Sequence, residues 1–203
     1  MSLSTDSLAP GFLIASPRLD GSLFERSVIL MINHDAHGAM GFIINRPLDV
    51  DFGSLLELVD LDGPITPTCY NQDVFFGGPV RVEQLWVMYH GTIAGAAPER
   101  TFEGLQEYGE VRFHEDWALS GTAHSIESFA FGAGVETFRP FVGYAGWGPG
   151  QLEEEIGEGS WLMLDFDEQF VLDAHTDAVW DLALARLGLD EATFLLMGKA
   201  GIA

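Results

Sequence analysis

Short apolar runs that end at prolines or polar residues constrain this chain more than any other feature. The runs GFLIASP (11–17) and RSVILMINH (26–34) have the pattern of buried strands. The segment HDAHGAMG (34–41) follows the second run and has the composition of a turn. The run FIINRP (42–47) then resumes the strand pattern until Pro47 ends it. This order predicts a hairpin.

The remaining segments mix strand and helix patterns. Strands are expected in DVFFGGPV (73–80) and QLWVMYHG (84–91), joined by a Gly-Gly-Pro turn, and in WALSG (117–121), FRPFVGYAGW (138–147) and SWLMLDF (160–166). Helices are expected in DFGSLLELVD (51–60), AHSIESFAFGAG (123–134), 177–187 with Thr176 as its N-cap, and DEATFLLMG (190–198). The glycine-rich segment 91–109 is expected to be a loop.

Hairpins dominate the first half of the chain, and helices are interspersed later. This distribution predicts an α+β fold with a mixed, mainly antiparallel sheet. The 203 residues suffice for one domain that buries roughly 70% of its unfolded surface. Because no repeat or low-complexity linker interrupts the chain, residues 1–203 are expected to form a single domain.

The charge balance is the most unusual part of the composition. Nine Lys and Arg residues stand against 31 Asp and Glu residues, which gives a net charge of −22. A field of that sign repels nucleic acid and anionic lipid, so direct nucleic-acid binding is disfavoured. Adaptation to a salty cytoplasm or selection for solubility would produce the same acidity.

Location and redox state follow from two further features. The start MSLSTDSLAP lacks the basic region of a signal peptide, and no run approaches the ~18 apolar residues that a membrane helix needs. The single cysteine, Cys69, excludes an internal disulfide and a cysteine-cluster metal site. A cytoplasmic protein without membrane association is expected.

The stretch GYAGWGPGQLEEE (143–155) is the most distinctive motif. Its glycines permit a tight turn, and Pro149 is placed to begin a helix. The glutamates of the first helical turns would repel a phosphate, and the glycine pattern is not that of a phosphate loop. We expect a turn and helix start, with Trp147 and Gln151 available at the rim of a binding site.

Two other groups of residues bear on chemistry. In HDAHG (34–38), His34 and His37 have a spacing that permits a metal site, but on a strand and turn it favours polar turn contacts instead. Arg26, Arg46 and Arg139 lie at the edges of apolar runs, where structural ion pairs are the ordinary role. Convergence of two of them with Asn45 would instead form a pocket for a carboxylate or phosphate. No activated nucleophile is found, so no catalytic residue, cofactor or metal is assigned.

The chain resembles the AlgH/YqgE family of bacterial proteins. The resemblance is carried by GFLIASPRL, FERSVILMINHDAHGAMGFIINRPL, VFFGGPV and FRPFVGYAGWGPGQLEEEIGEGSWL, in that order, and covers residues 11–188. It implies a single α+β domain with a branched sheet curled into a pseudo-barrel and flanked by helices. It also implies the label of transcriptional regulator, but no catalytic residues.

These observations lead to three hypotheses. The first is a cytosolic, non-enzymatic regulatory module that binds a partner protein or a small anionic metabolite. Its candidate binding residues are Arg26, His34, Asn45, Arg46, Gly77, Gly78, Trp147 and Gln151. The second is a DNA-binding regulator, which the net charge disfavours. The third is an enzyme that uses His34 and Arg46, and it requires these side chains to converge in one pocket.

Overall fold

The computed structural model describes residues 7–59, 61–93, 109–132, 135, 137–172, 178–190, 192–194 and 196. The chain divides into two compact units, of which unit 1 combines Met1–Arg46 with Ala145–Ala203 and unit 2 is Pro47–Tyr144. Strand β9 (Thr137–Trp147) contributes residues to the sheets of both units. None of the described helices is long and apolar enough to cross a membrane.

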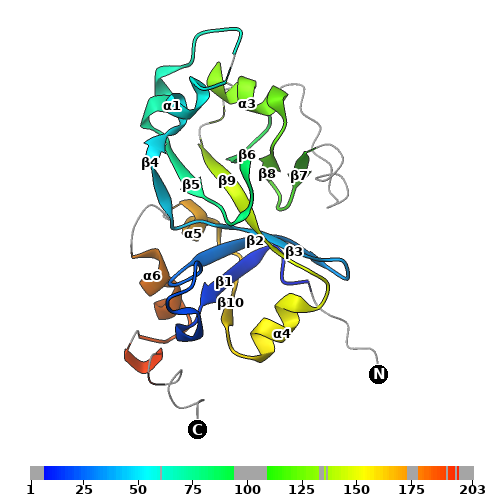
Figure 1. Cartoon of the computed structure of the whole chain (residues 1–203), viewed down its shortest axis with the longest axis vertical. Coiled ribbons are helices and arrows are strands. Elements are labelled where there is room, and N and C mark those ends of the chain that lie inside the picture. Colours follow the sequence, from blue (N-terminus) through cyan, green and yellow to red (C-terminus); the bar gives the residue numbers. More distant parts are fainter. Residues whose placement is uncertain are drawn as a thin grey trace. The chain divides into compact units, whose positions relative to one another are not determined.

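In the described part of unit 1, a five-stranded antiparallel sheet forms the centre. In spatial order its strands are β10 (Trp161–Asp165), β1 (Gly11–Ala15), β2 (Val28–Asp35), β3 (Gly38–Ile43) and the last residues of β9 (Figure 1). Every residue of β1 is buried, and so are the first five residues of β2. The apolar runs therefore form strands that are covered on both faces.

Short helices flank this sheet. A 3-10 turn, η1 (Pro17–Leu19), follows β1, and α4 (Gln151–Gly157) connects β9 to β10. The helices α5 (Glu168–Leu172) and α6 (Val179–Arg186) pack on β1. Phe170 of α5 lies 5.1 Å from Phe12, centroid to centroid, and the Trp180 indole of α6 donates to the backbone carbonyl of Ala15 at 3.0 Å.

The sheet of unit 1 is strongly curled. Trp147 ends β9 and Trp161 begins β10, so these residues stand on the two outermost strands. Four strand spacings in a flat sheet would separate them by roughly 19 Å. Their rings are nevertheless in contact, with centroids 6.0 Å apart. The two edges of the sheet therefore approach each other where α4 connects them.

In the described part of unit 2, the strand order is β4 (Pro47–Asp51), β5 (Asp73–Phe76), β9, β6 (Val80–His90), β8 (Trp117–Ser120) and β7 (Glu110–Arg112) (Figure 1). Strands β5 and β9 are parallel, and the other pairs are antiparallel. The core gathers side chains of α1 (Phe52–Leu56), η2 (Pro67–Asn71) and α3 (Ala123–Ala130) against the sheet, including Phe52, Cys69, Tyr89 and Phe129.

The predicted fold class is confirmed. The sheet is mixed and mainly antiparallel, helices flank it, and it branches at β9, because one edge of this strand pairs first with β5 and then with β3. The prediction of one domain over 1–203 stays a prediction, because the presence of two compact units does not test whether either folds alone.

Several predicted boundaries were wrong. Pro47 does not end the second hairpin strand: β3 stops at Ile43, and Pro47 begins β4. A proline is tolerated at the first residue of an edge strand, because the missing N–H breaks no ladder there. The helix predicted over 51–60 covers only Phe52–Leu56. The predicted cap Thr176 and residues 94–108 of the predicted loop lie outside the described residues, and Ala178 is the N-cap of α6.

A close backbone approach in unit 2 yields a stability prediction. A Cβ on Gly143 would lie 2.3 Å from the carbonyl oxygen of Gly78, and its φ of +67° is in the left-handed region. Gly143→Ala should therefore lower the free energy of unfolding by about 2 kcal/mol more than Gly188→Ala does. Gly188 has a similar φ of +73° but nothing within 4 Å of its Cβ position, so it isolates the steric clash. Urea denaturation measures both, and equal losses would contradict the clash.

A buried pair in unit 2 yields a pH prediction. The Tyr89 hydroxyl donates to Glu110 Oε1 at 2.5 Å, and burial, followed by this hydrogen bond, raises the pKa of Tyr89 above its ordinary value of 10.0. The unfolded chain therefore loses this proton first, and the free energy of unfolding should fall as the pH rises above about 10. Below that pH the contribution is fully present. Tyr89→Phe should reduce this alkaline slope, and an unchanged slope would contradict the raised pKa.

Candidate functional site

The motif 143–155 contains the predicted turn and helix start, but its first five residues belong to β9 and the helix begins at Gln151, not at Pro149. Glu155 holds the motif together. One carboxylate oxygen of Glu155 accepts the indole N–H groups of Trp147 at 2.9 Å and Trp161 at 2.8 Å. The other accepts the side-chain amide of Gln151 at 2.8 Å, and the Gln151 carbonyl oxygen accepts the backbone N–H of Gly148 at 3.0 Å. The predicted rim residues Trp147 and Gln151 thus make internal contacts to a shared acid.

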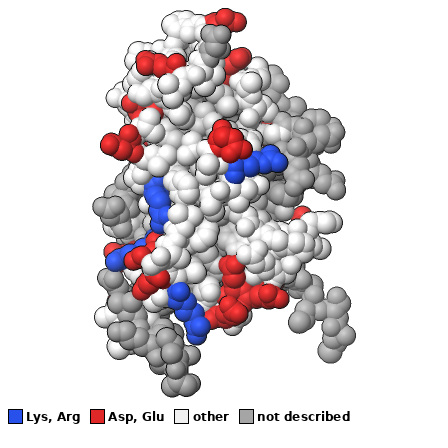
Figure 2. Space-filling view, in the orientation of Figure 1, with Lys and Arg blue, Asp and Glu red and all other residues white. Residues whose placement is uncertain are grey.

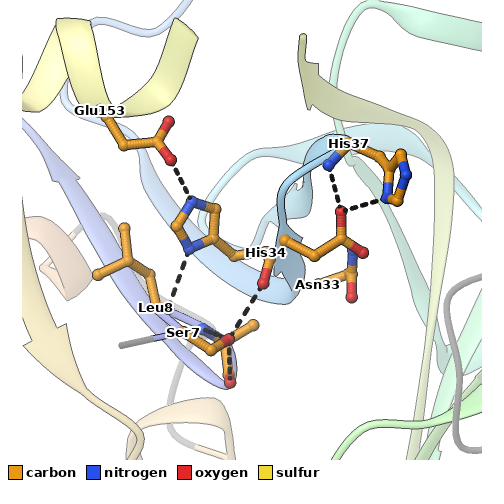
Figure 3. A network of polar contacts seen from close by, with 8 residues as sticks. Ser7, Leu8, Asn33, His34, His37 and Glu153 are labelled. Atoms are coloured by element: carbon orange, nitrogen blue, oxygen red, sulfur yellow. Dashed lines mark hydrogen bonds and ion pairs between the residues drawn. The ribbon is translucent and has the colours of Figure 1, made fainter. Parts of the chain in front are cut away.

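His34 lies in a second polar network of unit 1 (Figure 3). The backbone N–H of Leu8 donates to Nδ1 of His34 at 3.2 Å, so this nitrogen acts as an acceptor. In the neutral ring Nε2 then carries the hydrogen and faces Glu153 Oε1 at 3.1 Å. The Ser7 hydroxyl also donates to the backbone carbonyl of His34 at 3.3 Å. The network ties α4 and the segment before β1 to β2.

The two histidines of HDAHG do not share a binding point. The side chain of His34 is 4% exposed and contacts Glu153, whereas that of His37 is 86% exposed and contacts Asp35. Figure 3 shows the rings on separate sides of the hairpin. Among the described residues, no group of three or more His, Cys, Asp or Glu is arranged to hold a metal ion.

The residues Arg26, Asn45 and Arg46 stabilise the loop that precedes β2. The Asn45 side chain accepts the N–H of Val28 and donates to the carbonyl of Arg26, both at 2.9 Å. Arg46 donates to the backbone carbonyls of Leu23 and Glu25. Burial lowers the pKa of Arg46, and the nearby Glu25 charge opposes this shift.

The Arg26 side chain lies elsewhere than the Arg46 contacts. Its guanidinium is 4.6 Å from the centroid of the Trp180 ring and 3.5 Å from Asp181. The structure therefore gives Arg26, Arg46 and His34 different partners, and these side chains do not converge. Gly77 and Gly78 belong to unit 2, where Gly77 donates to the carbonyl of Val142 at 2.9 Å. Ligand binding by these predicted residues stays a prediction.

Unit 2 contains a cleft with a volume of about 630 Å³. We call it the β6–α3 cleft. Its apolar lining is Val59, Leu61, Leu85, Ala123 and Ile126, and its other lining residues are Arg81, Glu83, Gln84, Gly121 and Glu127. The volume falls in the range of about 300–1,000 Å³ that is usual for ligand sites.

Strand β6 forms one wall of the cleft, and its pairing with β9 is interrupted there by a bulge. On the β9 side, the register passes from Val80 opposite Tyr144 to Leu85 opposite Val142, so residues 81–84 have no opposing residue. Strand β8 pairs with β6 only from Val87 onward. Arg81 also has a φ of 49°, a left-handed conformation that costs a non-glycine residue roughly 1–2 kcal/mol. Bulges and such strain concentrate at functional sites.

The sequence analysis missed this cleft because its walls come from three separated segments, 59–61, 81–85 and 121–127. The only local signal is the pair Arg81 and Glu83, which places two charges on one side of a strand that is otherwise apolar from Leu85 to Tyr89. Charged residues at this spacing are also common on solvent-exposed edge strands, so the pair alone does not predict a binding site.

Comparison with known proteins identifies relatives over almost the full length. The AlgH-like family matches residues 12–192. A UPF0301 protein of Anaeromyxobacter dehalogenans is 36% identical over 94% of this chain and 93% of its own. A UPF0301 protein of Burkholderia mallei is 36% identical over 99% of both chains.

Two solved structures are also similar. The solution structure of the AlgH protein from Pseudomonas aeruginosa has a TM-score of 0.73 and 28% identity, and the match covers 97% of this chain and 96% of that one. A crystal structure from Corynebacterium diphtheriae has a TM-score of 0.61 at 22% identity, covering 92% and 90%, and shares the fold.

The contacts of Glu155 predict that its loss destabilises the fold far more than the loss of its neighbour Glu154. Glu155→Ala leaves two indole N–H groups without their acceptor and should lower the free energy of unfolding by about 3 kcal/mol. Glu154→Ala is the matched control, because Glu154 is exposed on the same helix, and it should change stability by no more than about 0.5 kcal/mol. Urea denaturation followed by tryptophan emission measures both variants. Similar losses in the two would show that Glu155 is not the residue that holds the motif.

Proposed function

The chain belongs to the AlgH-like family, and we propose that it is a non-enzymatic regulatory module of the cytoplasm that binds a partner protein in the β6–α3 cleft. The observation that carries the proposal is the cleft, which combines an apolar lining, a ligand-sized volume and a strained, bulged strand at its wall. Pockets of this kind with a few polar groups at the edge are the usual binding sites of proteins.

Charge favours a protein segment over a small anionic metabolite. Glu83 and Glu127 line the cleft against one cation, Arg81, and the whole chain has a net charge of −22. Figure 2 shows acidic groups scattered over the drawn face, with few basic ones. A small anion would approach against this field, whereas a segment with apolar and basic side chains would be attracted to it.

The other two hypotheses have less support. An enzyme acting through His34 and Arg46 requires them to meet, yet His34 contacts Leu8 and Glu153 while Arg46 contacts backbone carbonyls of residues 23 and 25. A DNA-binding helix would present basic side chains. In α6 the single arginine, Arg186, forms an ion pair with Asp167, and Asp181 adds a negative charge. Neither function has an observation of its own in favour.

A site-specific crosslinking experiment in the host cell tests the proposal. A photoreactive phenylalanine derivative replaces either Ala123, which lines the cleft, or His124, the next residue of α3, which does not. We expect a discrete crosslinked protein from position 123 and about tenfold less of it from position 124, because only the first position contacts a bound partner. Mass spectrometry of the product identifies the crosslinked peptide.

A blocking variant distinguishes cleft binding from chance proximity. Val59 lines the cleft and is 48% exposed, so Val59→Trp fills the cleft without replacing a core residue. Combined with the photoreactive group at 123, it should abolish the product. Equal crosslinking from 123 and 124, persistence of the product in the blocked variant, or no product at either position would each overturn the proposal.

A further inference from the structure

We propose that residues 7–10 are a proton-operated latch, which the neutral side chain of His34 holds against β2 and which protonation of His34 releases. The latch goes beyond the proposed function, because it belongs to unit 1 whereas the β6–α3 cleft belongs to unit 2. Three features of this region support it, namely the hydrogen bonds of the segment, the donor and acceptor pattern of the ring, and the charges around the ring.

The hydrogen bonds show that His34 alone attaches the segment. Both hydrogen bonds that join residues 7–10 to the remainder of the described chain end on this residue. The backbone N–H of Leu8 donates to Nδ1 of the ring at 3.2 Å, and the Ser7 hydroxyl donates to the backbone carbonyl of His34 at 3.3 Å. The other hydrogen bonds of the segment lie within it, between Ser7 and Ala9. One residue of β2 therefore supplies the polar attachment of the whole segment.

The contacts of the ring require its neutral form. A neutral imidazole has one N–H donor and one acceptor nitrogen, whereas the protonated ring has two donors. In His34 the acceptor Nδ1 faces the N–H of Leu8, and Nε2 faces Glu153 Oε1 at 3.1 Å (Figure 3). A proton on Nδ1 would place two donors against each other, so it must break the bond to Leu8. Because the side chain is only 4% exposed, the new N–H would also lack water as an acceptor while the segment is docked.

Protonation weakens only the side of the ring that faces the segment. On the other side, the hydrogen bond from a protonated ring to the Glu153 carboxylate is charge-assisted and stronger than one from the neutral ring. Glu155 of the same helix is directed to Trp147 and Trp161. The contact between β2 and α4 therefore persists when His34 gains a proton, while the contact with the segment is lost.

The other elements around the ring bring no second charge to it. Among the described residues, Glu153 is the only charged side chain that contacts the ring. The next residue of β2, Asp35, accepts hydrogen bonds from its own turn, and on β3 the residue opposite the histidine is Ala39. On β10, Asp165 stands at the end of the strand that pairs with the start of β1. Glu153 is thus the acid that favours the proton, and the N–H of Leu8 is the group that opposes it.

Docking of the segment and protonation of His34 therefore exclude each other. Histidine is the side chain whose ordinary titration falls between about pH 5 and 8, so an exclusion of this kind acts within the physiological range. Because only the neutral ring accepts from Leu8, the docking equilibrium constant falls about tenfold for each pH unit below the titration of the ring. The segment is docked at higher pH and is released as the pH falls.

Release changes the surface next to β10, the outermost strand of the sheet in unit 1. Ser7, Leu8 and Pro10 line a hollow of about 240 Å³. The rest of its lining comes from β1 and β10 and includes Phe12 and Leu13, which are buried while the segment is docked. When the segment leaves, this hollow opens to solvent. The proton therefore controls how much apolar surface unit 1 exposes there.

NMR spectroscopy of the full-length protein between about pH 8 and pH 5 tests the latch. The chemical shifts of the His34 ring report its protonation, and relaxation of the backbone amide nitrogens of Leu8 and Ala9 reports the order of the segment. We expect the order parameters of these amides to fall from about 0.85 to below about 0.6, with the same midpoint as the ring. The signals of β1 and α4 should stay those of the folded protein across this range.

A variant without the proton-binding group should keep the segment docked. His34→Asn retains an acceptor oxygen near the position of Nδ1 but cannot be protonated, so Leu8 should stay ordered over the whole range. His37→Asn is the matched control, because His37 is on the same hairpin but is 86% exposed and contacts Asp35 instead of the segment. It should release the segment at the same pH as the parent does.

Two further variants leave the ring in place and should shift the midpoint of release in opposite directions. Ser7→Ala removes one of the two hydrogen bonds that attach the segment and should raise the midpoint by about half a pH unit. Glu153→Gln keeps an acceptor for Nε2 but removes the charge that favours protonation, so it should lower the midpoint by a similar amount. This pair of variants decides the question even where His34→Asn fails to fold.

A segment that stays ordered after the ring is protonated would show that packing holds it, and would overturn the latch. The same conclusion follows if His34→Asn releases the segment at the pH of the parent, or if Ser7→Ala and Glu153→Gln shift the midpoint in one direction. Loss of the folded signals of β1 and α4 at the same midpoint would identify unfolding of unit 1 instead of release. None of these outcomes bears on crosslinking from position 123 in unit 2.

Discussion

The carboxylate of Glu155 is the contact on which the architecture of unit 1 depends. It joins Trp147 at the end of β9 to Trp161 at the start of β10, and these strands stand at opposite ends of the sheet order. A partly buried carboxylate that accepts three N–H groups is well satisfied, and loss of the acid would leave indole donors without water to replace it. Glu155 therefore links α4 to both edges of the curled sheet.

The three consecutive glutamates show why a sequence motif can be located more easily than it can be interpreted. Glu153 contacts His34, Glu154 is exposed, and Glu155 holds the two tryptophans. The helix dipole favours all three in the first turns, so their presence predicts a helix start correctly. Their separate contacts depend on β2 and β10, which the local sequence does not specify.

The sequence predicts the strands and the fold class because those depend on local patterns. The runs 11–17 and 26–34 contain the buried strands β1 and β2, as their composition indicates. The candidate site could not be predicted in the same way. Its walls are 59–61, 81–85 and 121–127, and the bulge at Arg81 arises only from the register between β6 and β9. Pairing registers over sixty residues are not encoded in any window of the sequence.

The distribution of arginines is the main argument for proposing a site for a basic segment instead of an anion site. Most of the arginines described in the structure have internal partners: Arg26 contacts Trp180 and Asp181, Arg46 and Arg112 bind backbone carbonyls, and Arg186 pairs with Asp167. A chain with nine basic residues that commits them to its own loops retains little positive charge for a ligand. Its surface offers carboxylates instead, and Glu83 and Glu127 supply them beside the β6–α3 cleft. An acidic rim of this kind attracts a basic segment and repels a small anion, which is the reason for proposing a protein segment as the occupant of the cleft.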